Sequence, residues 1–234
     1  MKVLITSGGT TESIDRVRGI TNFATGSLGK IIAEKYIENG HFVILLAGKN
    51  AKLPDPSDNL KIISISDTQS LDENMAKYVP QVDIVIHSMA VSDYSPIYMT
   101  DFEEVSTSDN LNEFLNMKNS SKKISSKSDY QVLFLKKNPK IISKIKEYNN
   151  DVILVGFKLL VGVSKNELFS VARTSLEKNK ADYIFANDLE DIFDGQHIGY
   201  LVDENEEKIA HTKNEIAELI FTTTLKKLEG EING

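Results

Sequence analysis

One loop near the start of the chain has the residue types that hold an anionic ligand. The glycine pair Gly8-Gly9 follows a short apolar run, and Gly26 precedes a helix-like stretch. A loop that leaves a strand and enters a helix presents free N–H groups at the positive end of the helix dipole, which suits phosphate or carboxylate. Arg18 and Asn22 add a cation and an amide to the same loop. The stretch therefore predicts a ligand site.

The glycine pattern has two other interpretations. Glycines can simply allow a tight turn and close packing of a helix on a sheet. They can also serve a nicotinamide dinucleotide, which would place an acidic residue just after the second strand. That strand ends in the sequence LLAGK, residues 45–49, without an acid, although Lys49 is compatible with NADP. An NAD(P)-dependent reductase is thus the first alternative.

The segment HSMAVSDYSP, residues 87–96, follows a later apolar run. Open α/β sheets bind ligands at the carboxyl ends of their strands. The small residues Ser88, Ala90 and Ser92 leave room for a flat group against the backbone. Asp93 is placed either to hold a cation or a ribose, or to cap a turn.

Other polar segments also follow apolar runs. In LKKNPKII, residues 135–142, Asn138 can cap a helix and Pro139 suits its first turn, which predicts a second anion site. Phe157 and Lys158 offer an aromatic face and a cation. The pair Lys122-Lys123 is either solvated or closes over a triphosphate, where it would stabilise developing charge.

Composition excludes several classes of function. The chain has 234 residues, a net charge of −7 and no cysteine. The negative charge argues against nucleic acid as a partner. Without cysteine there is no disulfide, thiolate nucleophile or cysteine zinc site. No apolar run approaches the length of a membrane span and no secretory leader is seen, so we expect a cytoplasmic protein without a membrane partner. The motifs HExxH, GxSxG and GxxxxGK[ST] are absent.

Strand-like and helix-like segments alternate along the chain. This pattern predicts an α/β fold, a Rossmann-like three-layer sandwich with a mostly parallel sheet, helices on both faces and an antiparallel hairpin over 196–211 near the C-terminal edge. The predicted strands are 3–6, 42–47, 60–65, 82–88, 130–135, 152–157 and 183–186. The predicted helices are 27–39, 68–79, 138–148, 164–180 and 212–229. We expect one domain over 1–234, with a mobile excursion at about 95–130.

In their order, these motifs resemble one family, phosphopantothenate–cysteine ligase. The matching stretches are ITSGGTTESIDRVRGITNFATGSLG, HSMAVSDYSP, KKIS, LKKNPKII, VGFK and DYIFANDL. The resemblance implies that 4′-phosphopantothenate attacks the α-phosphate of CTP, with Mg²⁺ as cofactor. Pyrophosphate leaves, and L-cysteine then displaces CMP from the acyl-cytidylate to form an amide. It also implies the stand-alone form in coenzyme A biosynthesis, without flavin, and a homodimer.

The resemblance assigns roles to individual residues. Asn22 and Lys123 would be catalytic, Asn22 by hydrogen-bonding the acyl-cytidylate and Lys123 as a flap lysine on the triphosphate. Asp93 would bind the nucleotide or its metal. The substrate-binding residues would be Arg18, Gly8, Gly9, Gly26 and Ala90. The nucleotide-binding residues would be His87, Ser88, Met89, Asp93, Lys123, Pro139, Lys140, Ile141, Ile142, Phe157, Lys178 and Lys180.

The chain departs from the fused bacterial members of this family at two places. It has GFKLLVG where they have GFAAET, and Lys158 resembles eukaryotic relatives that use ATP, so both nucleotides stay open. Asn179 stands where those members carry a lysine, and either Lys178 or Lys180 beside it is placed to reach phosphate. A nucleotide-binding module without catalysis is the remaining alternative, besides the reductase.

Overall fold

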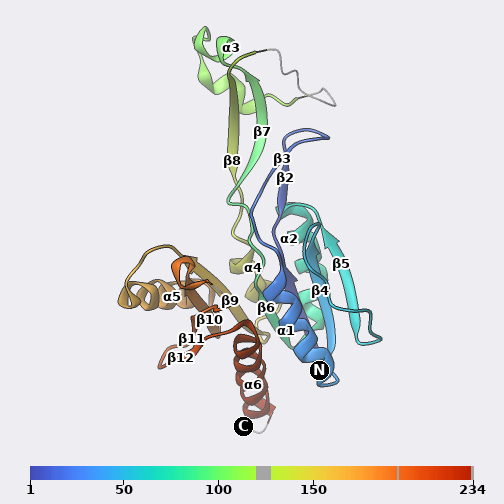
Figure 1. Ribbon diagram of the computed structural model, residues 1–234. Coiled ribbons are helices and arrows are strands. Elements are labelled where there is room, and N and C mark those ends of the chain that lie inside the picture. Colours follow the sequence, from blue (N-terminus) through green and yellow to red (C-terminus); the bar gives the residue numbers. More distant parts are fainter. Residues whose placement is uncertain (120–127, 194, 233–234) are drawn as a thin grey trace.

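An eight-stranded sheet forms the centre of the protein in the computed structural model (Figure 1), which describes residues 1–119, 128–193 and 195–232. Its strands, in spatial order, are β12 (Glu207–Ala210), β11 (Gly199–Val202), β10 (Tyr183–Asp188), β9 (Ile153–Leu160), β6 (Ile84–His87), β1 (Lys2–Ser7), β4 (Phe42–Gly48) and β5 (Leu60–Ile65). From β10 to β5 all neighbours are parallel, whereas β11 and β12 add the predicted antiparallel hairpin. The predicted α/β class is confirmed.

Helices cover both faces of this sheet. One face carries α1 (Ser27–Glu38) and α6 (Lys213–Ile232), and the other carries α2 (Thr68–Tyr78), α4 (Ile141–Tyr148) and α5 (Lys165–Asn179). Alternate residues of the central strands point to opposite faces: Leu4 packs in the core under α2, α4 and α5, while Val3 and Ile5 pack under α1 and α6. A strand that is buried on both faces is therefore expected to have a continuous run of apolar residues.

The chain order of the strands locates the place where a ligand is expected. From β1 the chain proceeds outward to β4 and β5, and then returns to β6 on the other side of β1. At this reversal the connections leave β1 and β6 toward opposite faces, which opens a crevice beyond their carboxyl ends. The segments that follow Ser7 and His87 therefore border the crevice.

A separate two-stranded arm extends away from the sheet (Figure 1). It pairs β7 (Tyr94–Asp101) with β8 (Gln131–Lys137) in antiparallel fashion, with an irregularity between Pro96 and Tyr98. The described part of its outer end contains α3 (Phe102–Ser106) and the 3₁₀ turn η2 (Leu111–Asn116). The rings of Tyr98, Phe114 and Phe134 pack together there, and Phe114 is buried.

The arm corrects two expectations. The strand predicted over 130–135 is wrong as a member of the parallel sheet, because β8 pairs with β7 instead. Within 95–129, where no helix or strand was predicted, the described residues form most of β7, together with α3 and η2. A shorter ribbon of β2 (Thr11–Ser13) and β3 (Gly19–Thr21) also lies within the first loop, where no strand was predicted.

Candidate active site

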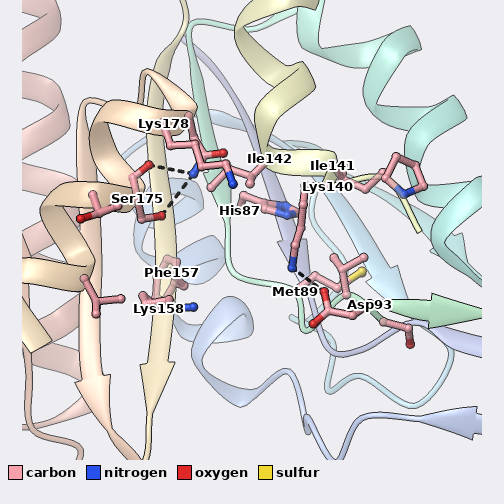
Figure 2. Close-up of a pocket in the computed structure, with 16 residues that line it drawn as sticks. His87, Met89, Asp93, Lys140, Ile141, Ile142, Phe157, Lys158, Ser175 and Lys178 are labelled. Atoms are coloured by element: carbon pink, nitrogen blue, oxygen red, sulfur yellow. Dashed lines mark hydrogen bonds and ion pairs between the residues drawn. The ribbon is translucent and has the colours of Figure 1, made fainter. Parts of the chain in front are cut away.

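A cavity of about 330 Å³ lies at the carboxyl ends of β6 and β9 (Figure 2). It brings together most of the residues predicted to bind a nucleotide. These are His87, Met89, Asp93, Pro139, Lys140, Ile141, Ile142, Phe157 and Lys178. The rest of its wall comes mainly from residues of α5 that were not predicted to bind the nucleotide, and it includes Lys158, which was predicted as a cation for phosphate. The remaining residues are Val91, Ser92, Lys158, Val171, Thr174, Ser175 and Asn179.

The apolar part of the cavity depends on a close contact between α4 and β9. A Cβ at Gly156 would lie 2.7 Å from Ile142 Cδ1 and 2.8 Å from Ile184 Cδ1. Glycine at this position therefore lets the start of α4 approach the strand. Phe157 follows it and packs on Phe185, with ring centroids 5.4 Å apart. Phe157 packs with the core under α1 and α6, whereas Ile142 packs on the opposite face of the sheet, so the cavity wall at this contact is aliphatic.

His87 is a neutral hydrogen-bonding group at the floor of this cavity. Thr6 Oγ1 accepts a hydrogen bond from Met89 N at 3.1 Å and lies 3.0 Å from His87 Nδ1. The hydroxyl of Thr6 can donate to Nδ1 or accept from it, according to the tautomer of the ring. Burial lowers the pKa of His87 to about 4, so the ring is neutral near pH 7.

Asp93 and Lys140 form an ion pair at the mouth of the cavity. Lys140 Nζ lies 2.5 Å from Asp93 Oδ1 (Figure 2), and both side chains are more than half exposed. An exposed pair of this kind contributes at most about 1 kcal/mol, so either group can exchange its partner for a ligand at small cost. Within the described part of the chain, no three acidic or histidine side chains gather as a metal site.

A second cluster of predicted residues lies beside the first, at the crevice between β1 and β6. Ala90 N donates to Gly8 O at 2.8 Å, and Asn22 Nδ2 donates to Ala90 O at 3.2 Å. A Cβ at Gly9 would lie 3.2 Å from Asn22 O, so this glycine lets the Asn22 segment approach. Gly26 has φ of +70°, and its carbonyl accepts from Ser7 Oγ. These residues are thus brought together.

The two clusters share one segment of backbone. Met89 and Val91 line the nucleotide-sized cavity, whereas Ala90 between them contacts the glycine loop. A ligand in the cavity and a ligand at the glycine loop would therefore meet across residues 89–91.

The structure places three predicted residues outside these clusters, and a fourth cannot be placed. Ser88 Oγ donates to Thr6 O, away from the cavity lining. Lys180 ends α5 in a left-handed conformation, with φ of 51°, and does not line the cavity. Arg18 lies between β2 and β3 and pairs with Asp15 at 2.8 Å. Lys123 lies outside the described residues.

A buried polar network that was not predicted holds the two ribbons against the sheet. Glu12 in β2 is 5% exposed. Its Oε1 accepts from the main-chain N and the Oγ1 of Thr68, at 2.9 and 2.6 Å, and its Oε2 accepts from Ser95 Oγ at 2.6 Å. Ser95 Oγ also lies 2.7 Å from Asn138 Oδ1, and Asn138 Nδ2 donates to Ser92 O.

The predicted capping role of Asn138 is wrong, since α4 begins after Lys140.

The fold and the site define a doubly wound α/β protein with a small-molecule site at its strand-order reversal. Comparisons with known proteins agree on its family. The model of the DNA/pantothenate metabolism flavoprotein C-terminal domain matches residues 1–104 and 108–228. The chain therefore belongs to this family.

Individual relatives support the same assignment. A crystal structure of a DNA/pantothenate metabolism flavoprotein from Streptococcus pneumoniae is 51% identical, with a TM-score of 0.92 over 99% of both chains. A structure of the C-terminal domain of the coenzyme A biosynthesis bifunctional protein CoaBC is 25% identical, with a TM-score of 0.72 over 98% of this chain and 96% of that one. The whole CoaBC protein of Methanocaldococcus jannaschii is 30% identical over 96% of this chain and 50% of its own length. This chain thus spans about half the length of that relative.

Among the described residues, no helix is both long and apolar enough to span a membrane.

Proposed function

We propose that this protein is a phosphopantothenate–cysteine ligase that acts in coenzyme A biosynthesis in the cytoplasm. It joins 4′-phosphopantothenate to L-cysteine and uses CTP to activate the carboxylate. The observation that carries the proposal is the adjacency of the two clusters: a nucleotide-sized cavity and a glycine loop share residues 89–91. The family match and the CoaBC names of the relatives point to the same pathway.

The adjacency fits the chemistry of carboxylate activation. A carboxylate is a poor acylating agent, so it must first displace pyrophosphate from the α-phosphate of a nucleotide. The α-phosphate and the carboxylate must therefore lie together, with the nucleotide on one side and the acid on the other. The cavity supplies the first side and the loop of Gly9 and Asn22 supplies the second. The acyl-cytidylate would form where Ala90 separates them.

Charged residues of the chain would serve the polyphosphate. Lys140 and Lys158 line the cavity and can neutralise phosphate oxygens, whereas Lys178 lines it from the last turn of α5. Asp93 would contribute one carboxylate to a Mg²⁺ ion that the nucleotide carries, since magnesium is commonly held by one or two carboxylates together with substrate phosphates. Lys123 would approach the triphosphate from the segment between η2 and β8. Arg18 would help to hold phosphopantothenate.

Asn22 would act in the second half of the reaction. Its amide already donates to Ala90 O, so its donor group lies at the border between the two clusters. Donation to the acyl-cytidylate would polarise the group that the cysteine amine attacks, and CMP would leave.

The exposed apolar side chains support a homodimer. Phe23, next to Asn22, is fully exposed, and Val17, Leu111 and Leu115 are each more than half exposed. Most of them lie on the β2–β3 ribbon and on the arm. Apolar surface of this kind is commonly covered by a partner. We propose that a second copy covers it, and that residues 1–234 act as one ligase domain with a flap at about 95–130.

A product assay tests the proposed function. The protein is incubated with phosphopantothenate, CTP, Mg²⁺ and cysteine, and pyrophosphate, CMP and the amide product are measured. We expect pyrophosphate release to require phosphopantothenate, and CMP release and amide formation to require cysteine as well. Tight NADPH binding without pyrophosphate or CMP would instead favour the reductase. Nucleotide binding without any turnover would favour a non-catalytic module.

A further inference from the structure

One polar group in the cavity wall is held in a fixed orientation. Asn179, the last residue of α5, is 8% exposed and lines the cavity. Its Nδ2 lies 2.7 Å from the main-chain oxygen of Ser175 and 3.2 Å from Ser175 Oγ, the two contacts dashed beside Ser175 in Figure 2. A main-chain oxygen can only accept, so the amide must turn its NH₂ group toward Ser175. The carbonyl oxygen Oδ1 accepts no hydrogen bond within the described part of the chain.

The sheet order indicates which part of a nucleotide reaches this oxygen. In the sheet, β6 lies between β1 and β9, and α5 follows β9 in the chain. The glycine loop lies on the β1 side of the cavity, at the crevice between β1 and β6. A nucleotide whose α-phosphate reaches that crevice therefore directs its opposite end, the base, toward α5. Apolar side chains of α4 and α5, among them Ile142 and Val171, also line the cavity.

Building on the proposed function, we infer that Asn179 selects the nucleobase, with Oδ1 accepting a hydrogen bond from an exocyclic amine of the base. Cytosine and adenine each carry such an amine. Uracil and guanine carry a carbonyl oxygen at the equivalent position, which would face Oδ1 and leave two acceptors without a proton between them. Burying an acceptor without a donor costs its full desolvation, so the selection acts mainly by rejecting keto bases.

The contact with Ser175 is what makes this selection possible. A freely rotating asparagine could turn its NH₂ group to a keto base and accept both kinds of base equally. Here that rotation would place Oδ1 against the main-chain oxygen of Ser175, only 2.7 Å from the present nitrogen. The helix backbone therefore fixes which end of the amide faces the cavity.

The test compares three triphosphates in the pyrophosphate-release assay: CTP, UTP and a CTP analogue with hydrogen in place of the 4-amino group. For the unaltered enzyme we expect kcat/KM with UTP and with the analogue to be at least about tenfold below that with CTP. Asn179→Ala should lower kcat/KM for CTP about tenfold and change it little for the analogue. Thr174→Ala, which truncates another lining residue of α5, should keep the ratio of CTP to UTP unchanged.

Equilibrium binding of the same triphosphates separates the failure of this inference from that of the proposed function. If no triphosphate releases pyrophosphate, the ligase proposal fails, while tighter binding of CTP than of the analogue still supports base selection. Equal use and equal binding of CTP and the analogue by the unaltered protein would overturn the inference, whatever the stability of the variant. An equal loss for all three triphosphates in Asn179→Ala would also overturn it.

Discussion

At the scale of single residues, Asn22 offers the sharpest test of the two-step chemistry. Asn22→Asp removes both amide donors and adds a negative charge beside Ala90 O, to which the amide now donates. We expect formation of the acyl-cytidylate to continue, whereas its attack by cysteine slows by about a hundredfold, the typical cost of losing one donor to a developing charge. Rapid-quench measurement of both steps in single turnovers checks this.

The matched control for this change is Asn150→Asp, which makes the same replacement in an exposed position away from both clusters. It should leave both steps unaltered. Equal slowing of both steps by Asn22→Asp would remove the role that we give to Asn22 and assign it to general shaping of the loop.

The buried imidazole of His87 predicts a pH dependence of stability. Its pKa is about 4 in the folded protein and near 6.5 when unfolded, so the unfolded chain binds the extra proton first as the pH falls. The stability linked to this group is complete above pH 6.5 and is lost as the pH falls toward 4. The loss amounts to roughly 3 kcal/mol. Urea unfolding at several pH values should show His87→Gln losing less stability than the unaltered protein over this range.

The exposed His211 provides the control for this measurement. His211→Gln should follow the unaltered protein across the same range of pH. If His87→Gln also follows it, the buried ring does not contribute the expected linkage.

Some residues of the candidate site could be placed from the sequence, because they lie where a predicted strand ends. His87 and Phe157 lie at the ends of predicted apolar runs and Asp93 follows one, and all three line the cavity. Asn179 and Ser175 could not be assigned in this way, because two polar residues four apart on a helix have the same pattern as a solvated face. Only the packing of α5 against β9 shows that this face borders the cavity.

At the scale of elements, the Glu12 network predicts how the ribbons are held. Glu12→Met keeps the size of the side chain but removes both accepting oxygens, so the N–H and the hydroxyl of Thr68 lose their acceptor. We expect the free energy of unfolding to fall by about 1–3 kcal/mol, the usual cost of an unsatisfied buried group. Faster amide exchange in β7 and in the first turn of α2 should accompany the loss.

Glu73→Met is the matched control, since Glu73 is exposed on α2 and its carboxylate accepts from the exposed Gln69. It should change stability by less than about 0.5 kcal/mol. An equally small effect of Glu12→Met would mean that the network does not anchor the ribbons.

The arm shows why some elements escape prediction from sequence. The strands β1, β4, β6 and β9 are buried on both faces, so their apolar runs are unmistakable. By contrast, β7 has the sequence YSPIYMTD, in which Pro96 and the irregularity after it break the alternation. Both β7 and β8 are largely half-buried or exposed in a ribbon of only two strands. The sequence of β8 predicted a strand over 130–135 but not its partner, whereas β7 is recognised only by its pairing with β8.

At the scale of the whole molecule, a homodimer would bring residues of two copies near one site. The arm leads away from the sheet that carries the cavity (Figure 1). Asn119 and Ser128, which flank the segment of Lys123, bond to residues of the arm rather than of the sheet. We therefore expect Lys123 to serve the cavity of the partner, while Asn22 stays with Gly9 and Ala90 of its own chain.

Complementation between two inactive variants tests this arrangement. Asn22→Asp and Lys123→Ala are produced together with different affinity tags, and the mixed dimers are isolated. If each site takes Asn22 from one copy and Lys123 from the other, one site of a mixed dimer carries both changes and the second carries neither. The mixed dimer should then recover about half of the amide-forming activity of the unaltered dimer. Dimers of each variant alone should stay inactive in overall turnover. Mixed dimers as inactive as the parents would show that both residues serve a site within one chain.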